Sequence, residues 1–254
     1  MTYCVAVKLD AGMVFASDSR SNAGVDQVAT VRKMAVYERP GQRFLTLLWA
    51  GNLAVTQAVL DLLERWARDH GERSLWGVPS TAEAAALVGQ ALREVQSRDG
   101  PYLMQSNVDS SASFIVGGQV AGEAPRLFQV YAQGNFVEAS EDAPFLQIGE
   151  HKLGRPIIDR AVNPGSTLIN AAKCVLVSFD YTMRGNISVG LPIDLLCYTR
   201  DSLRAGLSRR IAESDPYFQM IQQQWGERLR RAVEEWPDPE WAADPALSAG
   251  SAGG

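Results

Sequence analysis

The sequence contains few of the residues that build metal centres, disulfide frameworks or histidine-based catalytic sites. Among its 254 residues there are only two histidines, His70 and His151. The three cysteines, Cys4, Cys174 and Cys197, lie far apart and form no Cys-x-x-Cys pair. Neither a disulfide framework nor a zinc site is therefore expected, and no metal or cofactor is predicted. A Ser/His/Asp arrangement would have to use one of the two histidines.

The sequence also lacks long runs of basic residues and long runs of apolar residues. The net charge is −5 and there is no Lys/Arg block, so neither nucleic acid nor an anionic membrane is an expected partner. No apolar run approaches the roughly 18–20 residues of a membrane span, and the N-terminus lacks the pattern of a signal peptide. Glycine-rich phosphate loops are absent too. These absences favour a cytoplasmic globular protein, and 46% apolar residues suffice for one sizeable core.

The first fifty residues predict two successive β-hairpins. Their turns are indicated by Asp10-Ala11-Gly12 and by Arg39-Pro40-Gly41-Gln42. The expected strands are 3–9, 13–17, 34–37 and 44–49.

Helical periodicity follows the second hairpin. Apolar residues recur at steps of three or four from Val55 to Trp66, in a helix expected to end near His70-Gly71. A second helix begins at Ser80 or Thr81 and continues through Val95. The next expected elements are strands at 113–116, 127–132, 136–139 and 145–148, helices at 153–161 and 166–183, and strands at 187–189 and 194–198. A last helix is predicted to start at Asp215-Pro216 and to carry an apolar stripe as far as Trp236.

The order of these elements predicts the fold class. Strands and helices come in separate blocks, which indicates layered sheets covered by helices and not a βαβ alternation. We expect one domain over residues 2–236. The Pro-, Ala-, Gly- and Ser-rich segment 237–254 is expected to be a flexible C-terminal tail.

Thr2 is the candidate nucleophile. A small second residue permits removal of Met1, which would leave a free α-amine beside the Thr2 hydroxyl. That amine has an ordinary pKa of roughly 7.7–8.0 and can serve as the general base that a hydroxyl nucleophile needs. One residue would then carry both groups, and no histidine would be required. Taken alone, Met-Thr is a common start without chemical meaning.

Three further residues strengthen this interpretation. Asp18 lies in Ser17-Asp18-Ser19-Arg20, Lys33 in Val31-Arg32-Lys33-Met34, and Gly51 follows a predicted strand. The two hairpins could bring Asp18 and Lys33 to Thr2. Each residue also has an ordinary interpretation: a turn carboxylate, a solvated lysine and a helix-start glycine. All of them together at this spacing make a catalytic group the better interpretation.

These motifs resemble the proteasome β-subunit superfamily, and more closely the bacterial Anbu, or ancestral β-subunit, family. The resemblance rests on the opening Met1-Thr2-Tyr3-Cys4, on the stretch from Leu9 to Arg20, and on Arg32-Lys33-Met34. It implies an α+β fold, a four-layer αββα sandwich of the N-terminal-nucleophile hydrolase type. By element order it covers most of residues 2–236.

The resemblance also implies roles for individual residues. Thr2 Oγ would attack a carbonyl, the Lys33 ammonium would favour its alkoxide, and Asp18 would hold Lys33. The Gly51 N–H would donate to the oxyanion, which is typically worth about 2.7–4 kcal/mol. Asp180 matches a supporting aspartate. The residues expected to line the specificity pocket are Ser21, Val31, Trp49 and Ala50, with small or medium apolar side chains preferred.

The sequence departs from the family pattern at three positions. Lys33 is one residue closer to Thr2 than is typical, and we expect the deletion to lie in the loop around 22–27, because a deletion inside a strand would turn the side chain away. Glu150 follows Gly149 where the family has a supporting serine. Met183 occupies a second serine position, and Thr182 is the candidate replacement.

Three functions remain open from the sequence. The first is a self-compartmentalising threonine peptidase, a homo-oligomeric ring or ring-like assembly of about a dozen subunits by resemblance. The second is an amidase with the same nucleophile acting on a small amide or isopeptide bond, which the ATP-grasp and transglutaminase-like partners associated with Anbu proteins make credible. The third is a weakly active or inactive scaffold subunit, expected if Met1 is retained.

Overall fold

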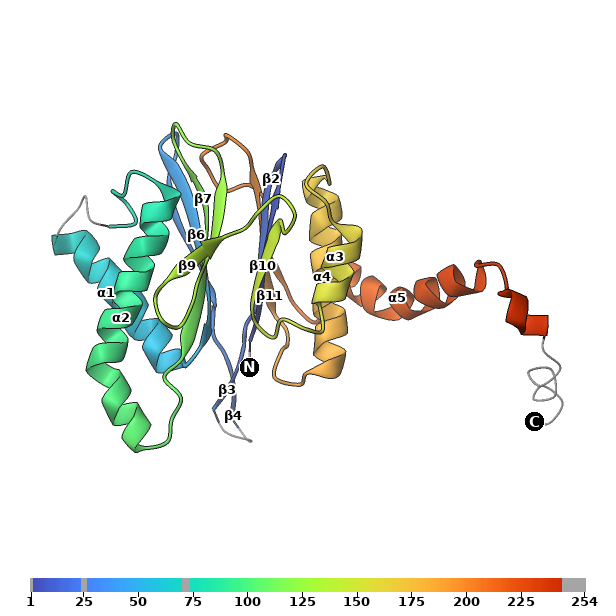
Figure 1. Cartoon of the computed structure of the whole chain (residues 1–254), viewed down its shortest axis with the longest axis horizontal. Helices are drawn as coiled ribbons and strands as arrows, with labels where there is room; N and C mark the ends of the chain where they lie inside the picture. Colours follow the sequence, from blue (N-terminus) through green and yellow to red (C-terminus); the bar gives the residue numbers. More distant parts are fainter. Residues whose placement is uncertain (1, 24–26, 70–73, 244–254) are drawn as a thin grey trace.

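Two five-stranded antiparallel sheets pack face to face and are covered by helices on their outer faces (Figure 1). The computed structural model describes residues 2–23, 27–69 and 74–243, with the side chains of 21–29 and 243 excepted. The layer order is helix, sheet, sheet, helix, so the expected four-layer αββα sandwich is confirmed.

The first sheet carries the N-terminus. Its strands follow the order β10-β1-β2-β11-β12. Their bounds are β1 (Tyr3–Leu9), β2 (Gly12–Asp18), β10 (Phe145–Gly149), β11 (Ile193–Thr199) and β12 (Ser208–Ile211). Helices α3 (Arg155–Ala161) and α4 (Leu168–Gly185) lie on its outer side. Because Cys4 pairs with Ser17 across the first hairpin, Thr2 and Asp18 come to the same end of the sheet.

The second sheet follows the order β5-β6-β7-β8-β9. Its strands are β5 (Met34–Arg39), β6 (Arg43–Gly51), β7 (Ala112–Val120), β8 (Arg126–Val130) and β9 (Phe136–Glu138). Helices α1 (Leu53–Asp69) and α2 (Thr81–Gln105) cover its outer face. Strand β6 alternates as the pleat requires: Leu45, Leu47 and Trp49 face these helices, whereas Phe44, Leu48 and Ala50 pack between the sheets.

Two helix starts follow the expected capping chemistry. Ser80 Oγ accepts from the Glu83 N–H at the start of α2, and Asp215 accepts from the Phe218 N–H at the start of α5 (Pro216–Glu234). Both predicted starts are confirmed. The expected end of the first helix, at His70-Gly71, lies outside the described residues.

Other sequence expectations need correction. Residues 187–189 form no strand, because the Ser188 N–H donates to the Asn186 side chain and the Val189 N–H to its carbonyl, which turns the chain. Helix α2 continues through Pro101 to Gln105, where Leu103 packs against the core. The hairpin of β3 (Arg20–Ala23) and β4 (Gln27–Thr30) and the edge strand β12 were not expected.

The C-terminal part of the chain leaves the sandwich. Figure 1 shows α5 extending away from α4 toward η1 (Glu240–Ala243). In the described ranges, no helix has the length and apolar character needed to cross a membrane.

Candidate active site

A buried ion pair lies at the end of the first hairpin. Asp18 is the last residue of β2 and is 0% exposed, and Lys33 immediately precedes β5 and is 5% exposed. The Lys33 ammonium donates to Asp18 Oδ1 at 2.8 Å and to the backbone carbonyl of Arg20. Lys33 therefore points at Asp18. The hairpin β3–β4 that joins them contains the segment expected to absorb the one-residue deletion.

Backbone donors complete the surroundings of the Asp18 carboxylate. The Tyr3 N–H donates to Oδ1 at 3.1 Å, and the N–H groups of Arg20 and Gly190 donate to Oδ2 at 3.2 and 3.4 Å. Burial raises the pKa of Asp18, whereas the Lys33 charge and the N–H groups of Tyr3 and Gly190 lower it. The buried carboxylate is thus held by contacts from three separate segments of the chain.

Thr2 is held directly beside this pair. It precedes Tyr3, whose N–H shares Asp18 Oδ1 with the Lys33 ammonium. The Thr2 carbonyl accepts from the Glu150 N–H at 2.6 Å, and the residue is 8% exposed. Gly149, with φ +80°, leaves room for this contact, because a Cβ there would overlap the Thr2 carbonyl. The structure therefore brings Thr2, Asp18 and Lys33 together.

Gly51 ends the strand that borders the same site. The Trp49 N–H in β6 donates to the Lys33 carbonyl at 3.2 Å, and the Cys4 thiol donates to the Trp49 carbonyl at 3.4 Å. These bonds tie β6 to both Lys33 and β1. Gly51 itself has φ +114°, and a Cβ there would overlap the carbonyl of Ser111. Only glycine fits this position without moving the backbone, and its role as an oxyanion donor stays a prediction.

The residues expected to line a specificity pocket differ in their surroundings. Trp49 is buried against the helices, and its indole N–H has no partner in the described part of the chain. Ala50 is buried between the sheets, and the Val31 N–H donates to the Ser19 carbonyl at 2.8 Å. The side chain of Ser21 lies outside those described. Their pocket role stays a prediction.

Asp180 lies apart from the ion pair. Its buried carboxylate is on α4 and pairs with Arg184 at 3.2 Å. Among the described contacts, none joins Asp180 to Asp18 or Lys33. The Thr182 hydroxyl donates to the Ser178 carbonyl at 2.7 Å, within α4. Neither contact supports a direct role beside Thr2, and the role assigned to Asp180 remains a hypothesis from the resemblance.

The segment from Asn186 to Gly190 reaches the site instead. Gly190 donates to Asp18, and the Asn186 amide donates to Glu150 Oε2 at 3.0 Å. Hydrogen bonds from the backbone and from Asn186 lower the pKa of Glu150 against the effect of its burial, which raises it. No residue type in the segment signals a site, because its contribution is largely backbone.

The geometry defines a class of protein. A hydroxyl residue at position 2, a buried ammonium–carboxylate pair and a strand-end glycine meet at one end of an αββα sandwich, as in the N-terminal-nucleophile hydrolases. The family model described as "Proteasome subunit" matches residues 2–194, and the chain therefore belongs to the proteasome subunit family.

Within this family, the chain resembles solved structures of Anbu proteins. It is 49% identical to the chain in "Helical Assembly of the Anbu Complex" from Pseudomonas aeruginosa, with a TM-score of 0.88 and coverage of 95% of this chain and 100% of that one. Anbu from Yersinia bercovieri is 45% identical, with a TM-score of 0.87 over 94% and 99% of the two chains. A mutant Anbu from Hyphomicrobium sp. strain MC1 is 44% identical, with a TM-score of 0.87 over 94% and 100%. A search of curated proteins found no match.

Proposed function

We propose that this chain is a threonine-type N-terminal-nucleophile hydrolase that cleaves amide bonds of peptides, with Thr2 as nucleophile after removal of Met1. The observation that carries the proposal is the shared Asp18 oxygen. It accepts from the Tyr3 N–H at 3.1 Å and from the Lys33 ammonium at 2.8 Å, which brings a buried cation to the residue next to Thr2. Membership of the proteasome subunit family supports a hydrolytic activity.

The proposed reaction uses groups of this chain alone. The Thr2 hydroxyl adds to the substrate carbonyl while its proton passes to the Thr2 α-amine, and the Lys33 ammonium stabilises the developing alkoxide electrostatically. The Gly51 N–H donates to the oxyanion. The protonated amine then gives its proton to the leaving nitrogen, and water hydrolyses the resulting ester. A cytoplasmic location, where Met1 is removed during synthesis, is part of the proposal.

Self-assembly is a second part of this proposal. The Pseudomonas aeruginosa relative forms a helical assembly, according to the name of its structure. The present chain carries exposed apolar side chains on and just after α5, at Leu229, Val233 and Trp236. Large exposed apolar groups on one helix are typical of subunit contacts. We therefore propose a homo-oligomer of this chain.

A β-lactone, which acylates hydroxyl nucleophiles, tests the proposed activity. Purified protein whose mass shows the loss of Met1 is treated with the lactone, and the adduct is located by peptide mass spectrometry. We expect a single adduct on Thr2, retained in Thr2→Ser and lost in Thr2→Ala. Alanine is also small, so Met1 is removed in that control as well. Retention of Met1 in the wild-type chain, or an adduct that persists in Thr2→Ala, would overturn the proposal.

A further inference from the structure

Arg20 contacts the ion pair and the loop beyond it at the same time. Its N–H donates to Asp18 Oδ2 at 3.2 Å, and its carbonyl accepts from the Lys33 ammonium. Its half-buried side chain turns the other way, and Nη1 donates to the Ile187 carbonyl at 2.8 Å. The backbone of this residue therefore belongs to the site, whereas its guanidinium belongs to the loop 186–190.

That loop is bonded to the site at both of its ends. The Gly190 N–H donates to Asp18 Oδ2 at 3.4 Å, which is a long hydrogen bond. At the other end Asn186 donates to Glu150, whose own N–H donates to the Thr2 carbonyl. A long hydrogen bond is easily broken by a small shift of its donor. A contact that holds the loop in place therefore also keeps the Gly190 N–H within reach of Asp18.

The Arg20 guanidinium lies against the backbone of Gly190. A Cβ on Gly190 would overlap the Arg20 side chain at Nε and Cζ, so only glycine lets the guanidinium pack this closely. The side chain thus covers the loop at Gly190 and binds it at the Ile187 carbonyl. A guanidinium group is planar and has several N–H donors, so it can make both contacts at once. A lysine ammonium cannot make both.

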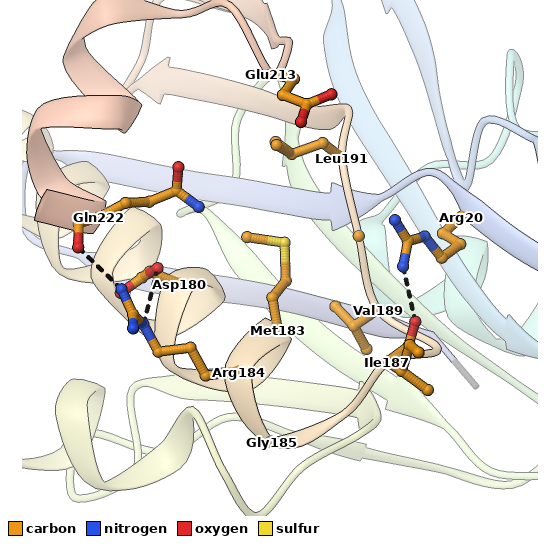
Figure 2. Close-up of a pocket in the computed structure, with 11 residues that line it drawn as sticks. Arg20, Asp180, Met183, Arg184, Gly185, Ile187, Val189, Leu191, Glu213 and Gln222 are labelled. Atoms are coloured by element: carbon orange, nitrogen blue, oxygen red, sulfur yellow. Dashed lines mark hydrogen bonds and ion pairs between the residues drawn. The ribbon is translucent and has the colours of Figure 1, made fainter.

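A cavity of about 690 Å³ lies behind the loop. Figure 2 shows Arg20 and its bond to Ile187 on one side of this cavity, and Arg184 bonded to Asp180 and Gln222 on the other. The cavity gives small solutes a path to the position of the Arg20 guanidinium. Removal of that side chain would therefore leave a space that a free guanidinium ion can enter.

We propose that Arg20 is a positioning residue, whose guanidinium holds the loop 186–190 so that the Gly190 N–H stays on Asp18 and Asp18 holds Lys33 beside Thr2. The inference rests on the proposed function. It concerns the side chain of Arg20, which has no described contact with Thr2 and acts through Gly190 and Asp18.

The proposal predicts a change in the pH dependence of the site. The loss of one N–H donor from the Asp18 carboxylate raises its pKa further, so its charge is lost at a higher pH on acidification. Among the described residues, the groups that interact electrostatically with Asp18 are the Lys33 ammonium and the Cys4 thiol, and burial raises the pKa of that thiol so that it stays neutral. The Thr2 α-amine, free once Met1 is removed, is a further titratable group beside Asp18. On the neighbouring β11, Asp194 is paired with Arg210 at 2.7 Å.

The test compares rates of Thr2 acylation by the β-lactone in the wild type, Arg20→Ala and Arg20→Lys, each with Met1 removed. We expect the second-order rate to fall about tenfold or more in both variants, the effect of weakening one hydrogen bond to a charged group. On the acid limb of the pH–rate profile, the Thr2 α-amine, with an ordinary pKa of roughly 7.7–8.0, sets the first step. The second step, where Asp18 loses its charge, should move to higher pH. Millimolar guanidinium ion should restore much of the rate in Arg20→Ala and none in Arg20→Lys, whose side chain still occupies the space.

A matched control distinguishes this positioning role from a general effect of losing a half-buried arginine on the stability of the fold. Arg126→Ala removes another half-buried arginine, one that pairs with Glu138 on the second sheet, and it should leave the rate and the pH profile unchanged. If Arg20→Ala labels at the wild-type rate with the same acid limb, or if guanidinium ion fails to raise a reduced rate, Arg20 has no positioning role. A wild type that is not labelled at Thr2 would instead overturn the proposed function.

A second variant disturbs the contact between Arg20 and Gly190 by changing Gly190. Gly190→Ala would displace the guanidinium without removing it, and it should slow acylation as Arg20→Ala does. The double variant should be no slower than either single one, because both changes break the same contact. Additive losses in the double variant would contradict the proposed coupling.

Discussion

Asp18 is a buried carboxylate, and among the described residues Lys33 is the cation that pairs with it. Lys33 supplies the ammonium at 2.8 Å, and both side chains are almost fully buried. Removal of one member of a buried pair leaves the other uncompensated, which typically costs about 3–5 kcal/mol. We predict that Lys33→Met abolishes lactone labelling of Thr2 and destabilises the fold by about that amount, as measured by urea unfolding at neutral pH.

The same variant should respond to pH in a defined direction. Without Lys33 the pKa of Asp18 in the folded state rises further above its ordinary value of about 3.9, so the folded protein binds a proton more readily than the unfolded chain. The variant should therefore recover stability as the pH is lowered from neutral. Exposed Lys173 on α4 provides the control, since Lys173→Met should change neither stability nor labelling. A deficit in Lys33→Met that stays constant with pH would refute this explanation.

Gly51 is required by its backbone conformation. At φ +114°, and with the carbonyl of Ser111 in the position of a Cβ, alanine forces the end of β6 to move. We predict that Gly51→Ala lowers the free energy of unfolding by more than about 1 kcal/mol and abolishes labelling of Thr2. Gly41→Ala is a matched control, because this glycine also has positive φ but open space around it. Normal labelling of Gly51→Ala would contradict the requirement for glycine at this position.

Individual residues differed in how well the sequence predicted them. Thr2, Asp18 and Lys33 were found because their side chains carry recognisable chemistry, and the structure brings them together. Gly190 was not found, because its contribution is one backbone N–H whose direction depends on the turn at Asn186. The resemblance drew attention to Asp180, but sequence spacing cannot show that its carboxylate pairs with Arg184 on the same helix.

At the scale of elements, strand β1 is fixed by a buried contact to α4. The Tyr3 hydroxyl bonds to Ser178 at 3.0 Å and accepts from the Gln147 amide at 2.7 Å. Tyr3→Phe would leave that amide without an acceptor, which typically costs about 1–3 kcal/mol. We predict this loss in urea unfolding with an unchanged m-value, whereas exposed Tyr181→Phe should cost nothing measurable. Equal stability of Tyr3→Phe and wild type would show that β1 does not depend on this contact.

Elements with a clear apolar period were predicted well, and the short strand β9 was also expected, whereas three four-residue strands were missed. The first helix and strand β6 have clear apolar periods, so their types could be read from the sequence. Strands β3, β4 and β12 have four residues each, too few for an alternation to be recognised. Residues 187–189 contain two β-branched or apolar side chains in a row of three, but side-chain hydrogen bonds at Asn186 turn them into a loop.

At the scale of the whole molecule, α5 extends away from the sandwich (Figure 1). Leu229, Val233 and Trp236 are 49%, 54% and 71% exposed. If this stripe is a subunit contact, replacing the three residues by glutamine should lower the mass found by light scattering while circular dichroism is retained. Glutamine at Arg231 and Glu234 of the same helix is the control. An unchanged mass in the triple variant would exclude the stripe as an assembly contact.

An epoxyketone tests the central claim most directly, because its ring-forming adduct needs a hydroxyl that adds to the ketone and a free amine that opens the epoxide. The intact mass and the sequenced N-terminal peptide are measured after reaction. We predict one adduct on Thr2, whose amine no longer reacts with amine-specific reagents. A Thr2 that remains unmodified, or an adduct elsewhere in the chain, would contradict the proposal that this terminus provides both base and nucleophile.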